Sequence, residues 1–212
     1  MSDSEGNTSL ETATSPTRIV GGRQPNPMYE LFVLGELMVQ PLHGYLLHEI
    51  VNMILGPFHR LSWGTLYPLI RRLEQEGLIT STTEKRREGL FQAERGPARK
   101  AYTLTETGRA RFFALMLDPG DYNPDYPNLF AMKFTKFGYL TPAQRLAVLE
   151  HYRTFLITLR DHYRTVKSQV VDNPEIMEIE RPYILRLLED RVGTLEQELT
   201  WLDSQIADTT NH

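Results

Sequence analysis

Cationic and hydrogen-bonding side chains gather in one stretch of this sequence, residues 59–101. That stretch carries nine basic and five acidic residues, whereas residues 1–58 carry two and six, and residues 102–212 carry twelve and sixteen. A basic block between acidic flanks is a candidate contact surface for a phosphate backbone, although the net charge of the chain is −4. A solvated surface with clustered charge accounts for the same counts, so charge alone leaves both interpretations open.

Two elements within the basic block are expected to present these side chains. A helix is predicted to begin after Ser62, a favoured N-cap residue, and to reach Glu76, with Gly77 ending it and Pro68 distorting it locally. Residues 78–83 and 101–105 have the composition of two strands, which predicts a hairpin with a long charged tip. The hairpin cations are Lys85, Arg86, Arg87, Arg95, Arg99 and Lys100.

The apolar spacing around this block predicts three more helices. Helical periodicity is present at residues 28–39 and 44–55, and again at 106–117, after Thr105 as N-cap. The inner side of the last of these is predicted to hold Ala110, Phe113, Ala114 and Leu117. The order helix, helix, helix, hairpin, helix is typical of a winged helix-turn-helix, in which the third helix enters the major groove of DNA.

The outward side of the third helix supplies the first candidates for DNA contact. Hydrogen-bonding groups near the N-terminal end of such a helix meet base edges, and the amides of that end suit a phosphate. Packing against neighbouring helices is the alternative for the two aromatic residues of the set. The candidates are Ser62, Trp63, Thr65, Tyr67, Arg71 and Arg72.

Two long helices are predicted after a linker at residues 118–127 and a short helix near residues 129–137. Their apolar residues alternate at intervals of three and four, which is typical of coiled-coil packing. The first series is Leu149, Tyr152, Leu156, Leu159, Tyr163, Val166 and Val170, and the second is Leu185, Leu188, Val192, Leu195, Leu199, Leu202 and Ile206. A short connection makes the two helices antiparallel neighbours, and the second series is the expected dimer interface in a four-helix arrangement of two copies. A hairpin closed within one chain is the alternative.

The expected fold is therefore mainly α with a small β-wing. Its parts are a disordered tail (1–27), a winged helix-turn-helix domain (28–117), the linker (118–127), a helical dimerisation domain (128–207) and a short tail (208–212). The absence of cysteine excludes disulfides and thiolate metal sites and suits the cytoplasm. No phosphate-binding glycine loop, dinucleotide fingerprint or hydrolase motif is present, so neither an enzyme, a cofactor nor a metal site is expected.

Five short motifs in fixed order carry a resemblance to a known family. They are Tyr29-Glu30-Leu31-Phe32-Val33-Leu34, Pro41-Leu42-His43-Gly44-Tyr45, Ser62-Trp63-Gly64-Thr65-Leu66-Tyr67-Pro68 with Arg72-Leu73-Glu74, Glu76-Gly77-Leu78-Ile79, and Gly96-Pro97-Ala98-Arg99-Lys100-Ala101-Tyr102 before Leu104-Thr105. With these motifs residues 28–108 resemble the winged domain of PadR-family regulators, although the hairpin tip is longer than usual. The helical remainder resembles the larger PadR subfamily.

The resemblance implies a homodimeric repressor that binds an inverted-repeat operator and is released by a small aromatic molecule such as a phenolic acid. Its motif positions add five candidates for DNA contact: Gly64, Pro68, Arg99, Lys100 and Tyr102. Candidates for effector binding are His43, Tyr45, His151, Tyr152, Arg153 and Trp201, for which core or interface packing is the alternative. A MarR-like regulator and a winged helix that binds protein instead of DNA remain alternative functions.

Overall fold

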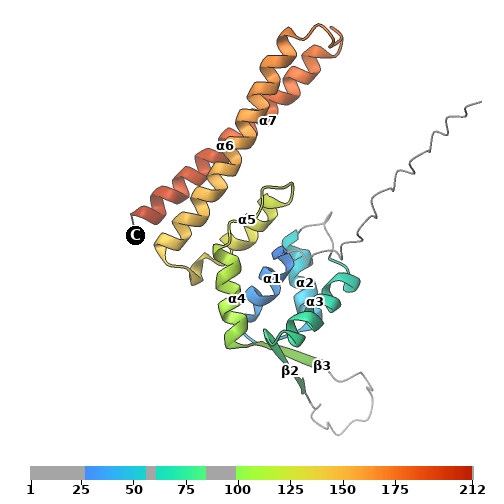
Figure 1. The fold of residues 1–212 in the computed structure, drawn as a ribbon, viewed down its shortest axis with the longest axis vertical. Coiled ribbons are helices and arrows are strands. Elements are labelled where there is room, and N and C mark those ends of the chain that lie inside the picture. Colours follow the sequence, from blue (N-terminus) through green and yellow to red (C-terminus); the bar gives the residue numbers. More distant parts are fainter. Residues whose placement is uncertain (1–26, 56–60, 85–98, 212) are drawn as a thin grey trace, which may run out of the picture.

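The computed structural model describes residues 27–55, 61–84 and 99–211. A winged helix-turn-helix forms the first half, and two long helices project from it (Figure 1). The elements in chain order are α1 (Pro27–Leu37), β1 (Leu42–His43), α2 (Gly44–Leu55), α3 (Trp63–Gln75), β2 (Ile79–Glu84), β3 (Arg99–Leu104), α4 (Glu106–Leu117), α5 (Tyr126–Phe134), a 3-10 turn η1 (Phe137–Tyr139), α6 (Pro142–Asp172) and α7 (Arg181–Thr210). The predicted fold class, mainly α with a small wing, is confirmed.

Several element boundaries differ from the sequence prediction by a few residues, three of them at the expected domain limits. Pro27, expected in the tail, is the first residue of α1, where its missing N–H costs nothing. Helix α5 begins at Tyr126, within the expected linker, and α7 continues to Thr210, within the expected second tail. The other residues of the first tail, 1–26, lie outside the described part of the chain.

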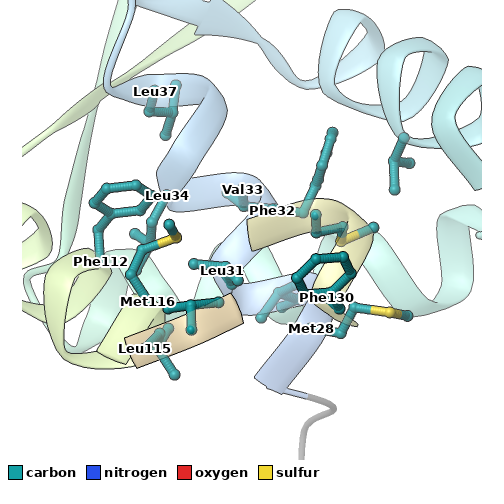
Figure 2. Packing of buried hydrophobic residues seen from close by; sticks show 14 of the residues in the cluster. Met28, Leu31, Phe32, Val33, Leu34, Leu37, Phe112, Leu115, Met116 and Phe130 are labelled. Atoms are coloured by element: carbon teal, nitrogen blue, oxygen red, sulfur yellow. The ribbon is translucent and has the colours of Figure 1, made fainter. Parts of the chain in front are cut away.

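Helix α1 lies at the centre of the hydrophobic core and is buried on nearly every side. Leu31, Val33 and Leu34 are at most 1% exposed, and Figure 2 shows them between side chains of α4 and α5, among them Phe112 and Phe130. A helix apolar all round is typical of a core element. The same hydrophobic cluster continues to residues of α6 and α7, so the winged half and the long helices share one core.

The wing is a three-stranded antiparallel sheet in the order β1-β3-β2. Strand β3 pairs with β2 from Ile79 opposite Leu104 to Glu84 opposite Arg99, as the hairpin prediction requires. Strand β1 places Leu42 opposite Tyr102 and was not predicted, because two residues carry no alternation to detect. Gly77 ends α3 in the left-handed region at φ 70°, as expected, and turns the chain directly into β2.

The inward face of α4 is not the predicted one. Phe112, Leu115 and Met116 are buried, whereas Ala110 and Ala114 are exposed. Thr105 caps the helix as predicted, since its Oγ1 accepts from the N–H of Gly108 at 3.0 Å and donates to the carbonyl of Leu78 at 2.9 Å. These bonds hold Gly108 close to the backbone of Leu78, the residue before β2. This contact, rather than the apolar periodicity, sets the rotation of α4.

Helices α6 and α7 form an antiparallel hairpin within one chain (Figure 1). Ion pairs join Arg153 to Asp203 at 2.7 Å and Lys167 to Glu189 at 3.0 Å. A later residue of α6 thus pairs with an earlier residue of α7, as antiparallel helices require. The predicted seam is confirmed as a packing surface: Leu188, Leu195, Leu199 and Leu202 are buried, while Leu185, Val192 and Ile206 are partly buried. In one chain the expected dimer-interface residues therefore already pack against α6. None of the described helices is long and apolar enough to cross a membrane.

A buried carboxylate connects α3 to the core. Glu30 on α1 is 2% exposed and accepts hydrogen bonds from Arg72 on α3 at 2.7 Å and Arg111 on α4 at 2.6 Å. Burial alone would raise the pKa of Glu30, but the two guanidinium groups outweigh it, and the pKa lies below its ordinary value of 4.5. Three helices are thereby joined at one charged point.

Replacing Gly108 by alanine is expected to lower the free energy of unfolding by about 1–3 kcal/mol, because the added Cβ would lie 1.9 Å from the carbonyl oxygen of Leu78. The matched control is Gly193→Ala on α7, where a Cβ meets nothing within 4 Å. That change should raise the free energy of unfolding by about 0.5–1 kcal/mol through helix propensity. Equal effects of the two substitutions in denaturant unfolding would contradict the close approach of α4 to Leu78.

Glu30→Gln is expected to lower the free energy of unfolding by about 1–3 kcal/mol at neutral pH. Because folding lowers the pKa of Glu30, its contribution is complete above 4.5 and is lost as the pH falls through the lower folded-state value. The difference between wild type and variant should therefore shrink at about pH 3. Glu175→Gln, at an exposed position between α6 and α7, should change little. A difference that is the same at both pH values would be evidence against a charged Glu30.

Candidate nucleic-acid interface

Helix α3 divides cleanly into a buried and an exposed face. Leu66, Leu69, Ile70 and Leu73 face the core, as predicted. The residues left outside are Trp63, Gly64, Thr65, Tyr67, Pro68 and Arg71, six of the expected DNA-contact positions. The helix runs unbroken through Pro68. Its exposed face thus combines aromatic, hydroxyl and cationic groups, the side-chain types that contact bases and phosphates.

The residue before α3 acts differently from the prediction. Ser62 has the extended backbone of an N-cap residue, but its side chain makes no capping bond to the helix backbone. Its Oγ instead lies 3.1 Å from Oγ1 of Thr65, while its carbonyl accepts from the N–H groups of Thr65 and Leu66. Two hydroxyl groups are thus paired at the exposed start of α3, where a base edge or phosphate would approach.

A stacked column of rings supports the exposed aromatic residues. The ring of Trp63 stacks on His48 of α2 with centroids 3.9 Å apart and planes at 9°, and Tyr67 stacks on Trp63 at 5.1 Å. Asn52 holds the base of the column, since its Nδ2 donates to the carbonyl of His48 at 2.8 Å and its Oδ1 accepts from the N–H of Leu61 at 2.7 Å. His48 and Asn52 were not predicted; their spacing of four on one helix was the available signal.

Beside this column the surface of α3 is hollowed. The hollow has a volume of about 420 Å³ and is lined by Trp63, Gly64, Tyr67, Pro68 and Arg71. Trp63 and Tyr67 are 39% and 48% exposed, so neither is a core residue. Trp63 thus packs on α2 through His48, as the packing alternative held, and both rings also keep part of their surface exposed.

Two predicted DNA contacts are corrected by the structure. Arg72 is engaged by Glu30 and by Glu76, at 2.7 and 3.3 Å, which turns it away from the exposed face of α3. Tyr102 is 6% exposed in the central strand β3, and burial raises the pKa of its hydroxyl. Both are therefore structural residues, and the helical pattern alone could not separate Arg72 from its neighbour Arg71.

The wing contributes fewer described residues than the sequence suggested. Arg99 and Lys100 begin β3, and Lys100 is exposed. The Nδ1 atom of His43 lies 3.1 Å from the carbonyl oxygen of Lys100. This contact links β1 to the start of β3. The other hairpin cations, Lys85, Arg86, Arg87 and Arg95, lie outside the described residues.

The candidate effector residues fall into two groups. His43 and Tyr45 stack on each other at 5.8 Å beside the wing. Tyr152 and Trp201 both contact Phe130 of α5, with centroids 3.8 and 6.4 Å away. Arg153 is paired with Asp203, so its charge is already matched. The aromatic cluster around α5 could not be predicted, because α5, α6 and α7 meet only in the folded chain.

A buried cation borders this aromatic cluster. Lys133 is 4% exposed and donates to the carbonyl of Asp118, and burial lowers its pKa to about 8. His151 lies against Tyr122 and Tyr126, and its pKa is lowered by burial and by Lys133. Its Nε2 atom is buried without a hydrogen-bond partner among the described residues. Two basic groups thus adjoin several aromatic rings. No group of three or more metal-ligating side chains occurs in the described segments.

Residues 33–114 match the model of the transcriptional regulator PadR-like family. Residues 33–114 are a PadR-family domain. This match contains α2, α3, the wing and nearly all of α4, and so includes the exposed face of α3. The resemblance predicted from the sequence motifs is confirmed. No curated protein sequence matches this chain.

Three solved structures of PadR proteins are similar to this chain at low identity. Bacillus subtilis PadR in complex with operator DNA is 18% identical, with a TM-score of 0.38 over 85% of this chain and 98% of that one. The same protein with p-coumaric acid is 17% identical, with a TM-score of 0.37 over 86% and 99%. A PadR-like transcriptional regulator from Bacillus cereus is 23% identical, with a TM-score of 0.34 over 84% and 99%.

The neighbouring arginines of α3 provide a matched pair of tests. Arg71→Ala should weaken binding to DNA and reduce the slope of log affinity against log salt by about 1, with little change in stability. Arg72→Ala should mainly lower the free energy of unfolding, because it leaves the carboxylate of Glu30 with one partner fewer. Anisotropy titrations and denaturant unfolding of both variants check this. The reverse assignment of effects would contradict the orientation of α3.

Proposed function

We propose that this PadR-family transcriptional regulator is a homodimeric repressor that binds an inverted-repeat operator through α3 and the wing. The exposed face of α3 is the observation that carries the proposal, because it presents Thr65, Tyr67 and Arg71 on a helix otherwise fixed in the core. Lys100 adds a cation at the start of β3, on the side of the hairpin loop. A two-fold dimer would read half-sites about 34 Å apart, one turn of DNA.

The surface of the α6–α7 hairpin supports dimerisation. Its seam is closed within the chain, yet large apolar side chains remain exposed on its outer surface and at its tip. They are Val171, Met177, Ile179, Tyr183, Leu187 and Trp201. Exposed apolar side chains, most of them near the tip of the hairpin, favour a protein interface, and a second copy would cover them with the same surface. In this proposal the predicted seam from Leu185 to Ile206 packs against α6 within each chain. It holds the exposed interface residues in place and does not form the interface alone.

We also propose that a small aromatic acid releases the repressor from DNA. The rings around Phe130 offer apolar contact, Lys133 offers positive charge and the Nε2 atom of His151 offers a hydrogen-bonding position, which together suit a phenolic carboxylate. Bacillus subtilis PadR, solved with p-coumaric acid, supports the choice of this compound. The site touches α5 and α6, which share the hydrophobic core with α1, so ligand binding there can bias the position of the winged half. The proposed compartment is the cytoplasm, where such a repressor meets DNA.

The test is selection of binding duplexes from a random DNA pool, followed by anisotropy titration of the enriched duplex over a salt series. The proposal predicts one enriched inverted repeat, a steep loss of affinity with salt and a complex of two chains per duplex. Addition of p-coumarate should weaken binding. Enrichment of no sequence would refute DNA recognition. Specific binding that ignores p-coumarate would remove this effector class and keep the repressor.

A further inference from the structure

The hollow on α3 has a chemical character that DNA binding in general does not require. Its lining is almost wholly apolar: two ring faces, a proline ring and a glycine, with Arg71 as the only charged member. A polar base edge placed against these ring surfaces would lose hydrogen bonds to water and find few replacements in the hollow. The hollow therefore selects among the groups that DNA presents.

The major groove displays one apolar group on the four unmodified bases, the C5-methyl of thymine. The other groups there are hydrogen-bond donors and acceptors or small C–H groups, none of which offers a methyl-sized apolar contact. We propose that, on the DNA of the proposed function, this hollow receives the methyl group of a thymine, while Arg71 neutralises a neighbouring phosphate. Trp63 and Tyr67 then specify a thymine in each half-site, and the inference rests on DNA binding by α3.

The stacked column makes this hollow a preformed site. The ring of Trp63 stacks against both His48 and Tyr67 before DNA binds. It therefore loses little rotational freedom on binding. His48 is itself fixed through Asn52 to the backbone of Leu61. His48 thus acts as a positioning residue that touches the wall of the hollow and need not touch the DNA.

Single thymine-to-uracil replacements test the inference, because they remove one methyl group and leave base pairing unchanged. The duplex enriched by selection is synthesised with deoxyuridine at each thymine position in turn. At one or more positions in the half-site affinity should fall about four-fold, the loss expected for one buried methyl group. Trp63→Ala should bind the thymine and uracil duplexes equally.

Further variants separate the hollow from general effects on DNA binding. His48→Ala should reduce the preference for thymine and keep the salt slope, since the Lys and Arg contacts to phosphate are unchanged. Tyr139→Ala, at an exposed aromatic position in η1, should keep the full preference. Thermal unfolding establishes that each variant is folded, and Tyr67→Ala replaces Trp63→Ala if the latter is not.

The outcomes distinguish this inference from the proposed function. A selected duplex that binds equally well with uracil at every position overturns the inference and leaves the repressor standing. So does a folded Trp63→Ala protein that retains the full thymine preference. If selection enriches no sequence, the proposed function fails and the thymine contact fails with it.

Discussion

The carboxylate of Glu30 is the point on which the orientation of the recognition helix depends. It is buried in α1 and holds Arg72 of α3 and Arg111 of α4 at hydrogen-bond distance. A buried charge is stable only when it is paired, so α3 can rotate neither way without leaving this group unmatched. With Arg72 turned inward, its neighbour Arg71 and the rings of Trp63 and Tyr67 are left on the outer face.

Glu30 also connects the exposed face of α3 to the rest of the molecule. Glu30 belongs to a helix that packs on α4 and α5, and these lead into the hairpin of α6 and α7. One continuous core therefore extends from α3 to the aromatic cluster around Phe130. The proposed release by an effector requires such a connection, because a ligand can shift the equilibrium only if it binds one arrangement of the two halves better than the other.

Much of this architecture could be predicted from sequence. The three-four spacing predicted α6 and α7, and Thr105 and Gly77 correctly marked a helix start and a helix end. Apolar periodicity gave wrong predictions where a tertiary contact sets the orientation of a helix or a side chain. The contact of Gly108 with Leu78 sets the rotation of α4. The ion pair with Glu30 holds Arg72, and β1 pairs with β3 at Tyr102. His48 and Asn52 were missed for the same reason, since their role exists only where α2 meets the start of α3.

The most direct test of the central claim is the accessibility of Trp63 to acrylamide. The chain has two tryptophans, so Trp201→Phe leaves Trp63 as the sole reporter of the α3 face. Fluorescence quenching is then measured with and without a specifically bound duplex. The account predicts that DNA shields the half-exposed ring and lowers the quenching constant. An unchanged constant at full occupancy of the duplex would show that DNA binds elsewhere.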